Sequence, residues 1–250
     1  MVSEIDQVAQ LIVNANRVVV FVGAGLSTES GIPDFRSPGG VWDRYDPEDF
    51  SFQNFLSSEP SRIRYWQMAT EMYDSMKNAQ PNPGHMAIAE LEALGKLDCL
   101  ITQNIDGLHF KAGNSPEKVL ELHGTAMHVT CLNCRKIYDR EEIQARIAKG
   151  DRAPRCDSCE GLLKPATISF GQAMPEAAMR RANALAATCD LLLAIGSSLV
   201  VWPAAGIPVL AKRSGARLVI INRDGTDFDH LADLVVRLDI GTVLAPFIAH

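Results

Sequence analysis

Four cysteines form two Cys-x-x-Cys pairs, Cys131 with Cys134 and Cys156 with Cys159. The pairs are separated by residues 135–155, which is 21 residues and one more than the usual spacing of such a zinc site. Four thiolates complete the tetrahedral shell of Zn²⁺ and leave no open position, so the spacing predicts a structural zinc ion. A redox pair and an iron–sulfur cluster are the alternatives, and the flanking residues support neither.

A glycine turn, Gly23-Ala24-Gly25, follows the apolar run of residues 18–22. Such a run is typical of a strand buried on both faces, and glycine lets the backbone approach a ligand closely. Amide groups at a turn of this kind can hold a pyrophosphate. Because Thr28 occupies the last position of Gly-x-Gly-x-x-Gly, a plain strand-to-helix turn is the alternative.

Two more polar clusters follow apolar runs. Gln103-Asn104-Ile105-Asp106 comes after residues 97–102, and His123 comes after residues 120–122. Ligands of an open α/β sheet bind beyond the carboxyl ends of its strands, so these clusters form a candidate site. A plain turn is the alternative for the first cluster, and a structural histidine is the alternative for the second.

The elements that must position these residues follow from the hydrophobic pattern. Strands alternate with helices, which predicts a doubly wound parallel α/β sheet. A short helix is expected between the cysteine pairs, within a small inserted zinc ribbon, and residues 199–203 are expected to be extended. The predicted helices are 4–15, 61–78, 82–94, 175–188 and 203–214, and the predicted strands are 18–22, 97–102, 190–195, 218–221 and 235–238.

Composition limits the function classes. The 250 residues are 47% hydrophobic, enough for a packed core. The net charge of −6 argues against a general nucleic-acid binder and is compatible with cationic peptide substrates. The N-terminus lacks the pattern of a secretory signal, and no segment has the ~18 apolar residues of a membrane span. We therefore expect a cytoplasmic protein with no membrane partner and no specific nucleic-acid partner.

Four motifs resemble those of a known family. GAGLSTESGIPDFRS, residues 23–37, resembles the N-terminal signature of the sirtuins, the NAD-consuming protein lysine deacylases. TQNIDGLH at 102–109 and ELHG at 121–124 are similar to two further sirtuin motifs, in the family's order. The segment KPATISFG at 164–171 resembles a fourth. Ala166 and Gln172, which follows the segment, depart from the family's pattern, and we expect these departures to affect the preferred sequence of the substrate peptide more than the chemistry. The resemblance extends to about Ile240.

This resemblance implies a division of the chain. A Rossmann-like NAD-binding domain would comprise residues 1–34, 81–125 and 165–250. A smaller part would comprise a helical and cofactor-loop segment, 35–80, and the zinc module, 126–164. The active-site channel would lie between the two.

The resemblance also implies a reaction. In sirtuins the oxygen of an acyl-lysine substrate attacks the ribose carbon that bears nicotinamide, and groups that position this centre do most of the work. His123 would be the catalytic base that takes a ribose proton, and Asn104 would orient the ribose or water. The further residues implied are, for NAD, Gly23, Ala24, Gly25, Ser27, Asp34, Phe35, Arg36, Gln103, Asn104, Ile105, Asp106, Gly196, Ser197, Ser198, Asn222 and Ile240, and, for the substrate, Ile168, Phe170, Gly171, Leu199 and Val200.

Individual roles follow for some of these residues. Asp106 and the Ile105 backbone would hold the nicotinamide carboxamide, and Gln103 would contact the ribose. Phe35 would cover the leaving nicotinamide, and Arg36 with Asp34 would order the cofactor loop. Two other classes remain open: mono-ADP-ribosyl transfer, which uses the same activated ribose, and a non-catalytic NAD or zinc-ribbon binding module. The presence of a base together with Asn104 and Asp106 counts against the second.

The acyl group can be predicted from one helix. Sirtuins that favour succinyl or malonyl lysine resemble one another in a Tyr-x-x-Arg pair, because a buried carboxylate needs such donors. Here Met68 and Met76 stand three residues after Tyr65 and Tyr73, so the pair is missing. A pocket lined by Trp66, Met68 and Met72 would be apolar and adaptable. We therefore expect acetyl and larger neutral acyl groups to be preferred over dicarboxylic ones.

Overall fold

A six-stranded sheet forms the centre of the larger part of the molecule. In this computed structural model, which describes residues 3–248, the strand order is β3-β2-β1-β7-β8-β9 and every neighbouring pair is parallel. The doubly wound α/β class is thereby confirmed, and residues 1–2 and 249–250 of the predicted large domain lie outside the described part. The strands are β1 (Val18–Val22), β2 (Leu97–Thr102), β3 (Val119–Glu121), β7 (Leu191–Ile195), β8 (Arg217–Ile221) and β9 (Leu234–Val236).

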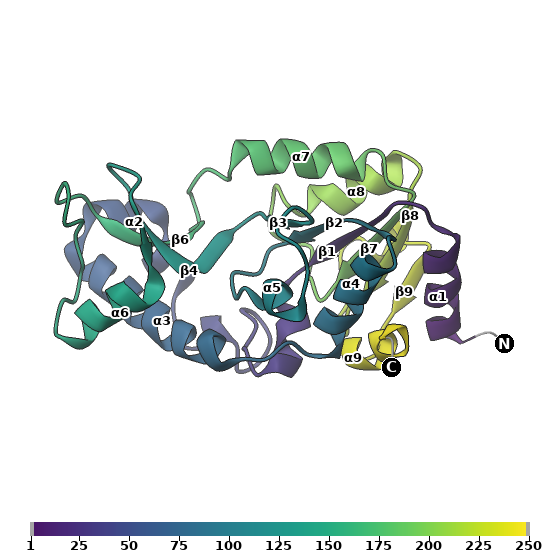
Figure 1. Ribbon diagram of the computed structural model, residues 1–250, viewed down its shortest axis with the longest axis horizontal. Coiled ribbons are helices and arrows are strands. Elements are labelled where there is room, and N and C mark those ends of the chain that lie inside the picture. Colours follow the sequence, from purple (N-terminus) through teal and green to yellow (C-terminus); the bar gives the residue numbers. More distant parts are fainter. Residues whose placement is uncertain (1–2, 249–250) are drawn as a thin grey trace.

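Helices cover both faces of this sheet (Figure 1). Side chains alternate along β1, so Val20 packs on one face with α1, α4 and α9, whereas Phe21 packs on the other with α7 and α8. This alternation explains why the whole apolar run is buried. The helices of this part are α1 (Glu4–Asn14), α4 (Pro83–Ala93), α5 (Leu108–Ala112), α7 (Glu176–Ala186), α8 (Gly206–Arg213) and α9 (Ile240–Leu244).

A three-stranded antiparallel sheet with the order β5-β4-β6 lies at the opposite end of the molecule from the two termini (Figure 1). It carries the cysteine pairs, and the helix expected between them is present. The exact limits of the domains stay a prediction. The elements here are β4 (Gly124–Cys131), β5 (Ile137–Asp139), β6 (Leu163–Thr167), α2 (Phe52–Ser57), α3 (Glu59–Asn78) and α6 (Arg140–Ala148).

A buried arginine attaches α3 to the zinc module. The Arg140 guanidinium lies 5.1 Å from the Trp66 ring and 4.9 Å from the Tyr73 ring, and its Nη2 donates to the Ala69 carbonyl at 2.9 Å. Cation–π contacts of this kind gain strength when they are removed from water. Trp66 thus packs on the zinc module, whereas the sequence placed it in an acyl pocket.

Several local predictions also differ from the structure. The glycine turn leads into a 3₁₀ helix, Ala24–Ser30, and α8 begins at Gly206 instead of Pro203. Residues 199–203 are not extended, because Leu199 has a φ of 56°, in the left-handed region that β-branched and bulky residues rarely adopt. The short helices α2 and α5 lie in segments for which no helix was predicted.

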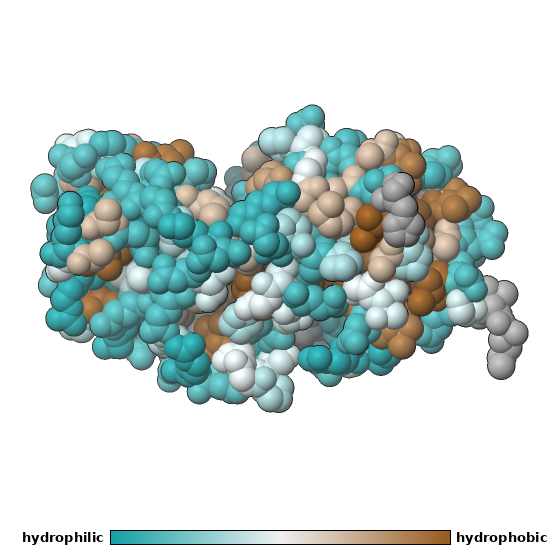
Figure 2. All heavy atoms as spheres, turned by 60° about the horizontal axis from the view of Figure 1, so that its bottom comes forward, coloured by the Kyte–Doolittle hydropathy of each residue, from teal (hydrophilic) through white to brown (hydrophobic). Residues whose placement is uncertain are grey.

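None of the helices within residues 3–248 combines the length and the apolar character that crossing a bilayer requires. On the face drawn in Figure 2 most side chains are hydrophilic, and apolar ones form small separate groups.

Candidate active site

The polar clusters predicted after separate strands meet at one edge of the large sheet. Parallel strands end at the same edge, so the segments after β1, β2, β3 and β7 come together there. The Gln103 side chain donates to the Ser197 hydroxyl at 2.9 Å and to the Val22 carbonyl at 3.1 Å. This one amide therefore links the ends of three strands.

The glycine turn after β1 packs tightly against the turn after β7. Gly25 N–H donates to the Gly196 carbonyl at 2.9 Å, and a Cβ built on Gly23 or Gly25 would lie 2.8 Å from that oxygen. Gly196 itself has a φ of 61°, which favours glycine. Glycine is therefore required at these positions not only for the close approach of a ligand but also because the turn after β1 and the turn after β7 are in backbone contact.

Three small polar side chains form a buried network beneath this turn. Asn104 Nδ2 donates to the Gly23 carbonyl and to the Ser27 hydroxyl, both at 3.1 Å, and Ser27 in turn donates to Asp106 Oδ2 at 2.7 Å. All three residues are at least nine-tenths buried. Buried polar groups are retained when their partners are satisfied, and here the network fixes the orientation of Asn104. Within residues 3–248 its Oδ1 has no hydrogen-bond donor, so it can accept from a ligand or water.

His123 lies at the same edge with a defined ring orientation. Its Nδ1 is 3.1 Å from the Gln103 carbonyl oxygen. A carbonyl only accepts, so the neutral ring carries its hydrogen on Nδ1 and leaves a lone pair on Nε2. Burial lowers the pKa of His123 below its usual range, and the hydrogen bond to Gln103 offsets only part of this effect. At neutral pH the ring is therefore a free base.

Two other histidines lie behind the network. The rings of His85 and His109 are 5.0 Å apart, and burial lowers the pKa of His85 to about 4 and that of His109 to about 3. Both are therefore neutral at pH 7. A structural role fits this burial, as does the capping contact in which His85 Nδ1 accepts from Asn82 N–H at 3.4 Å.

The predicted cofactor loop is ordered by a carboxylate and an aromatic row. Asp34 Oδ1 accepts from the backbone N–H groups of Arg36 at 2.9 Å and Ser37 at 2.8 Å. Burial alone would raise the pKa of Asp34, but these hydrogen bonds lower it. The carboxylate bonds the Arg36 backbone and leaves its guanidinium exposed, whereas we expected the two side chains to act together. Phe35 lies 5.3 Å from Trp42.

The predicted substrate segment is joined to the base. Ile168 N–H donates to the His123 carbonyl at 2.8 Å, and the Phe170 carbonyl accepts from Phe52 N–H at 2.8 Å. Phe170 and Gly171 are exposed. In the segment after β7, Leu199 is buried and has a left-handed backbone conformation. Its N–H donates to the Ser197 hydroxyl at 3.3 Å. The next residue, Val200, is 45% exposed.

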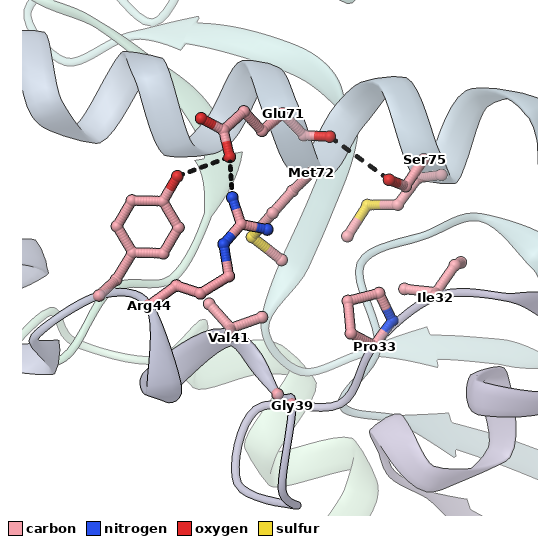
Figure 3. Close-up of a pocket in the computed structure, with 11 residues that line it drawn as sticks. Ile32, Pro33, Gly39, Val41, Arg44, Glu71, Met72 and Ser75 are labelled. Atoms are coloured by element: carbon pink, nitrogen blue, oxygen red, sulfur yellow. Dashed lines mark hydrogen bonds and ion pairs between the residues drawn. The ribbon is translucent and has the colours of Figure 1, made fainter.

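A small cavity separates the cofactor loop from α3 (Figure 3). Its walls include Ile32, Val41, Met72 and Met76, so of the three residues predicted for an acyl pocket only Met72 lines it; Met68 is buried among aromatic rings. At its rim Arg44 Nη2 pairs with Glu71 at 2.5 Å, and the Tyr45 hydroxyl donates to the same carboxylate at 2.7 Å. These contacts fasten the loop to the helix.

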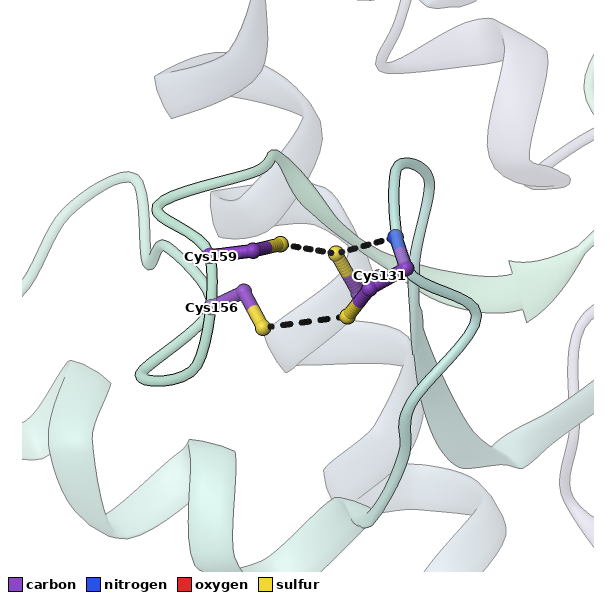
Figure 4. Close-up of side chains that lie close together, drawn as sticks. Cys131, Cys156 and Cys159 are labelled. Atoms are coloured by element: carbon purple, nitrogen blue, oxygen red, sulfur yellow. Dashed lines mark hydrogen bonds between the residues drawn. The ribbon is translucent and has the colours of Figure 1, made fainter.

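The four cysteines of the two pairs come together at one point (Figure 4). Their sulfur atoms lie within 4.8 Å of one another, with Cys131 Sγ 3.5 Å from Cys159 Sγ and Cys134 Sγ 3.6 Å from Cys156 Sγ. A tetrahedron with Zn–S bonds of about 2.3 Å has edges of about 3.8 Å, so the set fits one zinc ion. Cys99 and Cys189 are buried elsewhere, and burial raises the pKa of each thiol to about 11, as expected of inert cysteines.

Comparison with known proteins now identifies the family, since a model described as the Sir2 family matches residues 23–203. The chain belongs to the Sir2 family. It is 49% identical over 248 residues to NAD-dependent protein deacetylase 1 of Bradyrhizobium diazoefficiens, covering 99% of this chain and 96% of that protein. It is 42% identical over 250 residues to an NAD-dependent protein deacetylase of Sulfolobus acidocaldarius, covering 100% of this chain and 96% of that protein.

Solved structures agree with this assignment of the sirtuin fold. A complex of Sir2 with a p53 peptide and NAD⁺ matches at a TM-score of 0.89 and 37% identity, covering 97% of this chain and 96% of that one. A Sir2 complex with deacetylated p53 peptide and 3′-O-acetyl ADP-ribose matches at 0.91 and 36% identity, covering 98% and 97%.

The outer ends of the sirtuin's cofactor edge carry the remaining predicted residues. Ser198 is exposed, and Asn222 lies after β8, where its Nδ2 donates to the Asp224 carbonyl at 2.8 Å. Ile240 opens α9, and its Cδ1 would lie 3.0 Å from a Cβ on Gly196. Asn222 therefore lies at the β8 end of the same edge, with β1 and β7 between β8 and the strand that precedes Asn104, whereas Ile240 packs on Gly196 in the turn after β7.

Two further residues near the site could not be predicted from the sequence. Trp42 bridges Phe35 and Phe170, whose ring centroids lie 5.3 and 6.0 Å from its own; a lone tryptophan in a Gly- and Asp-rich loop was its only signal. Glu121 stands two residues before His123. Burial, and then the nearby Asp106 charge, raise the pKa of Glu121 to about 7, and nothing in the sequence indicated this.

Proposed function

We propose that this sirtuin is an NAD-dependent protein lysine deacylase, which transfers the acyl group to ADP-ribose and releases nicotinamide. The observation that carries the proposal is the neutral His123 ring, held through Nδ1 beside the buried network of Ser27, Asn104 and Asp106. A binding protein needs no oriented base. The names of the relatives and the Sir2 complexes with peptide and NAD⁺ support the same activity.

The edge of the sheet fits NAD as a co-substrate. The Ala24 amide and the hydroxyls of Ser197 and Ser198 are donors suited to phosphate and ribose oxygens, because the amides of Gly23 and Gly25 already donate to the carbonyls of Ile195 and Gly196. When bound, NAD supplies an electrophilic ribose carbon with nicotinamide as its leaving group. Gln103, Ile105, Asp106, Asn222 and Ile240 complete the set proposed to bind it.

Each residue at the reacting centre has a distinct task. His123 Nε2 takes the proton of a ribose hydroxyl, because Nδ1 is already committed to the Gln103 carbonyl. Asn104 Oδ1 accepts from the ribose or from water, because its Nδ2 is held by Gly23 and Ser27. Phe35 covers the nicotinamide side and excludes water. The acyl-lysine peptide lies between the 168–171 segment and residues 199–200.

Zinc has a structural task in this scheme. Four thiolates close its coordination shell, so the ion offers no position for a substrate. It would join the β4–β5 turn to the 156–159 turn and thereby support the sheet on which α3 is docked. The cytoplasmic location expected from the sequence stays a prediction.

Neutral acyl groups are the proposed substrates. The cavity beside the cofactor loop is lined mainly by Ile32, Val41, Met72 and Met76, and its basic residue, Arg44, is already paired with Glu71. A dicarboxylic acyl chain would have to bury its free carboxylate there without a free cation. Acetyl and larger neutral chains meet no such cost.

One incubation tests the function. The protein is mixed with an acetyl-lysine peptide, with and without NAD, and the products are analysed by mass spectrometry. We expect deacetylated peptide, nicotinamide and O-acetyl-ADP-ribose only when NAD is present. His123→Ala should abolish all three, whereas His128→Ala, which alters an exposed histidine on β4, should leave them unchanged. Transfer of ADP-ribose to protein without deacetylation would instead favour mono-ADP-ribosyl transfer.

A further inference from the structure

Lys164 on β6 is a buried ammonium group without an acidic partner. The residue is 1% exposed, and its Nζ donates to the Thr167 carbonyl at 2.6 Å. Within residues 3–248 it forms no ion pair with a carboxylate. An ammonium group removed from water is costly unless other groups compensate for its charge. The compensating group must therefore be something other than Asp or Glu.

Tyr65 on α3 supplies that compensation. It is 6% exposed, and its ring centroid lies 5.2 Å from Lys164 Nζ. Burial by itself raises the pKa of the Tyr65 phenol, but the Lys164 charge and hydrogen bonds with Ser169 and Thr167 outweigh burial, so the pKa is lowered. The other nearby cation, Arg62, is committed to the carbonyls of Phe55 and Leu56 at 3.1 and 3.2 Å.

Both side chains hold the same short segment. The Tyr65 hydroxyl lies 3.1 Å from Thr167 Oγ1, and Ser169 Oγ donates to it at 3.3 Å. Lys164 Nζ binds the Thr167 carbonyl. Ile168 lies between Thr167 and Ser169, and its N–H donates to the His123 carbonyl. The contacts of Tyr65 and Lys164 therefore end on the residues that flank the proposed peptide-binding position and the base.

We infer that Tyr65 and Lys164 form a buried cation–aromatic couple whose hydrogen bonds to Thr167 and Ser169 position the 167–170 segment for the acyl-peptide, so that they control peptide binding without touching NAD. The inference rests on the proposed function for its substrate. It adds a positioning role in peptide binding for two residues that are more than 95 positions apart in sequence. Both are positioning residues, since neither reaches the reacting atoms.

The couple can be tested without any substrate. Ionised tyrosine absorbs at 295 nm, and the chain contains four tyrosines. Burial and the bonded Glu71 raise the pKa of Tyr45, and burial and Glu141 raise that of Tyr73. As the pH is raised, we expect a first increase in absorbance at 295 nm at a pH below the usual pKa of a tyrosine phenol. This increase should be absent in Tyr65→Phe and in Lys164→Met. A first increase at that pH that persists in Tyr65→Phe overturns the couple.

Kinetics test the positioning. Tyr65→Phe keeps the ring over Lys164 and removes only the hydroxyl, so we expect the KM for an acetyl-lysine peptide to rise about tenfold, or ~1.4 kcal/mol, with the KM for NAD within about twofold. Tyr73→Phe is the matched control, because its hydroxyl bonds Glu141 in the zinc module at 2.7 Å; its peptide KM should not change. Lys164→Met should resemble Tyr65→Phe.

A purely structural role gives a different result. In that case Tyr65→Phe would lower the melting temperature and change kcat and both KM values together, or change none of them, and either outcome overturns the positioning role. If Lys164→Met does not fold, Lys164→Arg and Tyr65→Phe still decide the question. Absence of deacylation in the unaltered protein would contradict the proposed function, whereas the 295 nm titration would still report on the couple.

Discussion

Adding one methyl group to the glycine turn should separate the two loops at the cofactor edge. A Cβ on Gly25 would lie 2.8 Å from the Gly196 carbonyl oxygen, 3.0 Å from the Gly196 Cα and 3.1 Å from its carbonyl carbon. These are backbone atoms at the end of β7, so they cannot rotate away as a side chain can. Gly25→Ala must therefore move one of the loops and lengthen the 2.9 Å hydrogen bond between Gly25 N–H and Gly196.

The size of the effect follows from the contact distances. Overpacking of a close-packed site costs about 1–3 kcal/mol, to which partial loss of a hydrogen bond adds up to about 1 kcal/mol. For a chain of 250 residues, each kcal/mol shifts the melting temperature by about 2–4 °C. We expect Gly25→Ala to melt about 2–16 °C lower. NAD affinity should fall at least about tenfold, because the displaced turn carries the Ala24 amide of the proposed pyrophosphate site.

Gly225→Ala is the matched control for this variant. A Cβ at Gly225 would meet only side-chain atoms of Arg237 and Asp229, at 3.7 and 3.8 Å, which is ordinary contact. Its melting temperature should equal or slightly exceed that of the unaltered protein. Thermal unfolding and calorimetric titration with NAD measure both effects. If Gly25→Ala matches Gly225→Ala in both measurements, the proposed packing of the two loops is wrong.

Four further outcomes are expected. His123→Ala should lower kcat at least about 100-fold while NAD affinity, measured by calorimetry, stays within about tenfold, or ~1.4 kcal/mol. Since the pKa of His123 is lowered, the kcat of the unaltered protein should persist below pH 6.5 and fall only when the ring is protonated at lower pH; a fall centred above pH 6.5 would contradict this. Cys156→Ala should lose the single zinc ion found by metal analysis and unfold at lower temperature, and full metal content would refute the site. Acetyl-lysine should show a higher kcat/KM than succinyl-lysine on one peptide, and Met72→Arg should narrow that difference.

The strands and the chemistry-bearing clusters could be predicted because their signals are local. The apolar run before Gly23 and the amide cluster from Gln103 each lie within about ten consecutive residues, and a parallel sheet brings their ends to one edge. The two cysteine pairs likewise need only their spacing to indicate a common metal. In each of these cases residue type and position along the chain were sufficient.

The remaining features depend on residues that are distant in sequence. Trp42 joins the cofactor loop to Phe170, and Tyr65 compensates Lys164, which is almost 100 residues away. Trp66 was expected to line an apolar pocket, but its sequence context did not show what it packs on, and that neighbour is Arg140 of the zinc module. The extended path predicted for residues 199–203 was wrong because apolar and β-branched residues favour strands, whereas the buried Leu199 adopts a left-handed backbone here.

The place of the base depends on both the large sheet and the small one. The His123 ring is oriented by the Gln103 carbonyl at the end of β2, and the Gln103 side chain is itself held by Val22 and Ser197. The His123 carbonyl, in turn, receives the N–H of Ile168, just after β6 of the small sheet. A shift of β6 therefore displaces the backbone of His123 first, through the bond from Ile168. A shift at the end of β2 displaces the ring directly, through the Gln103 carbonyl. Disturbing β6 should impair peptide binding first, and disturbing the edge should impair the proton transfer first.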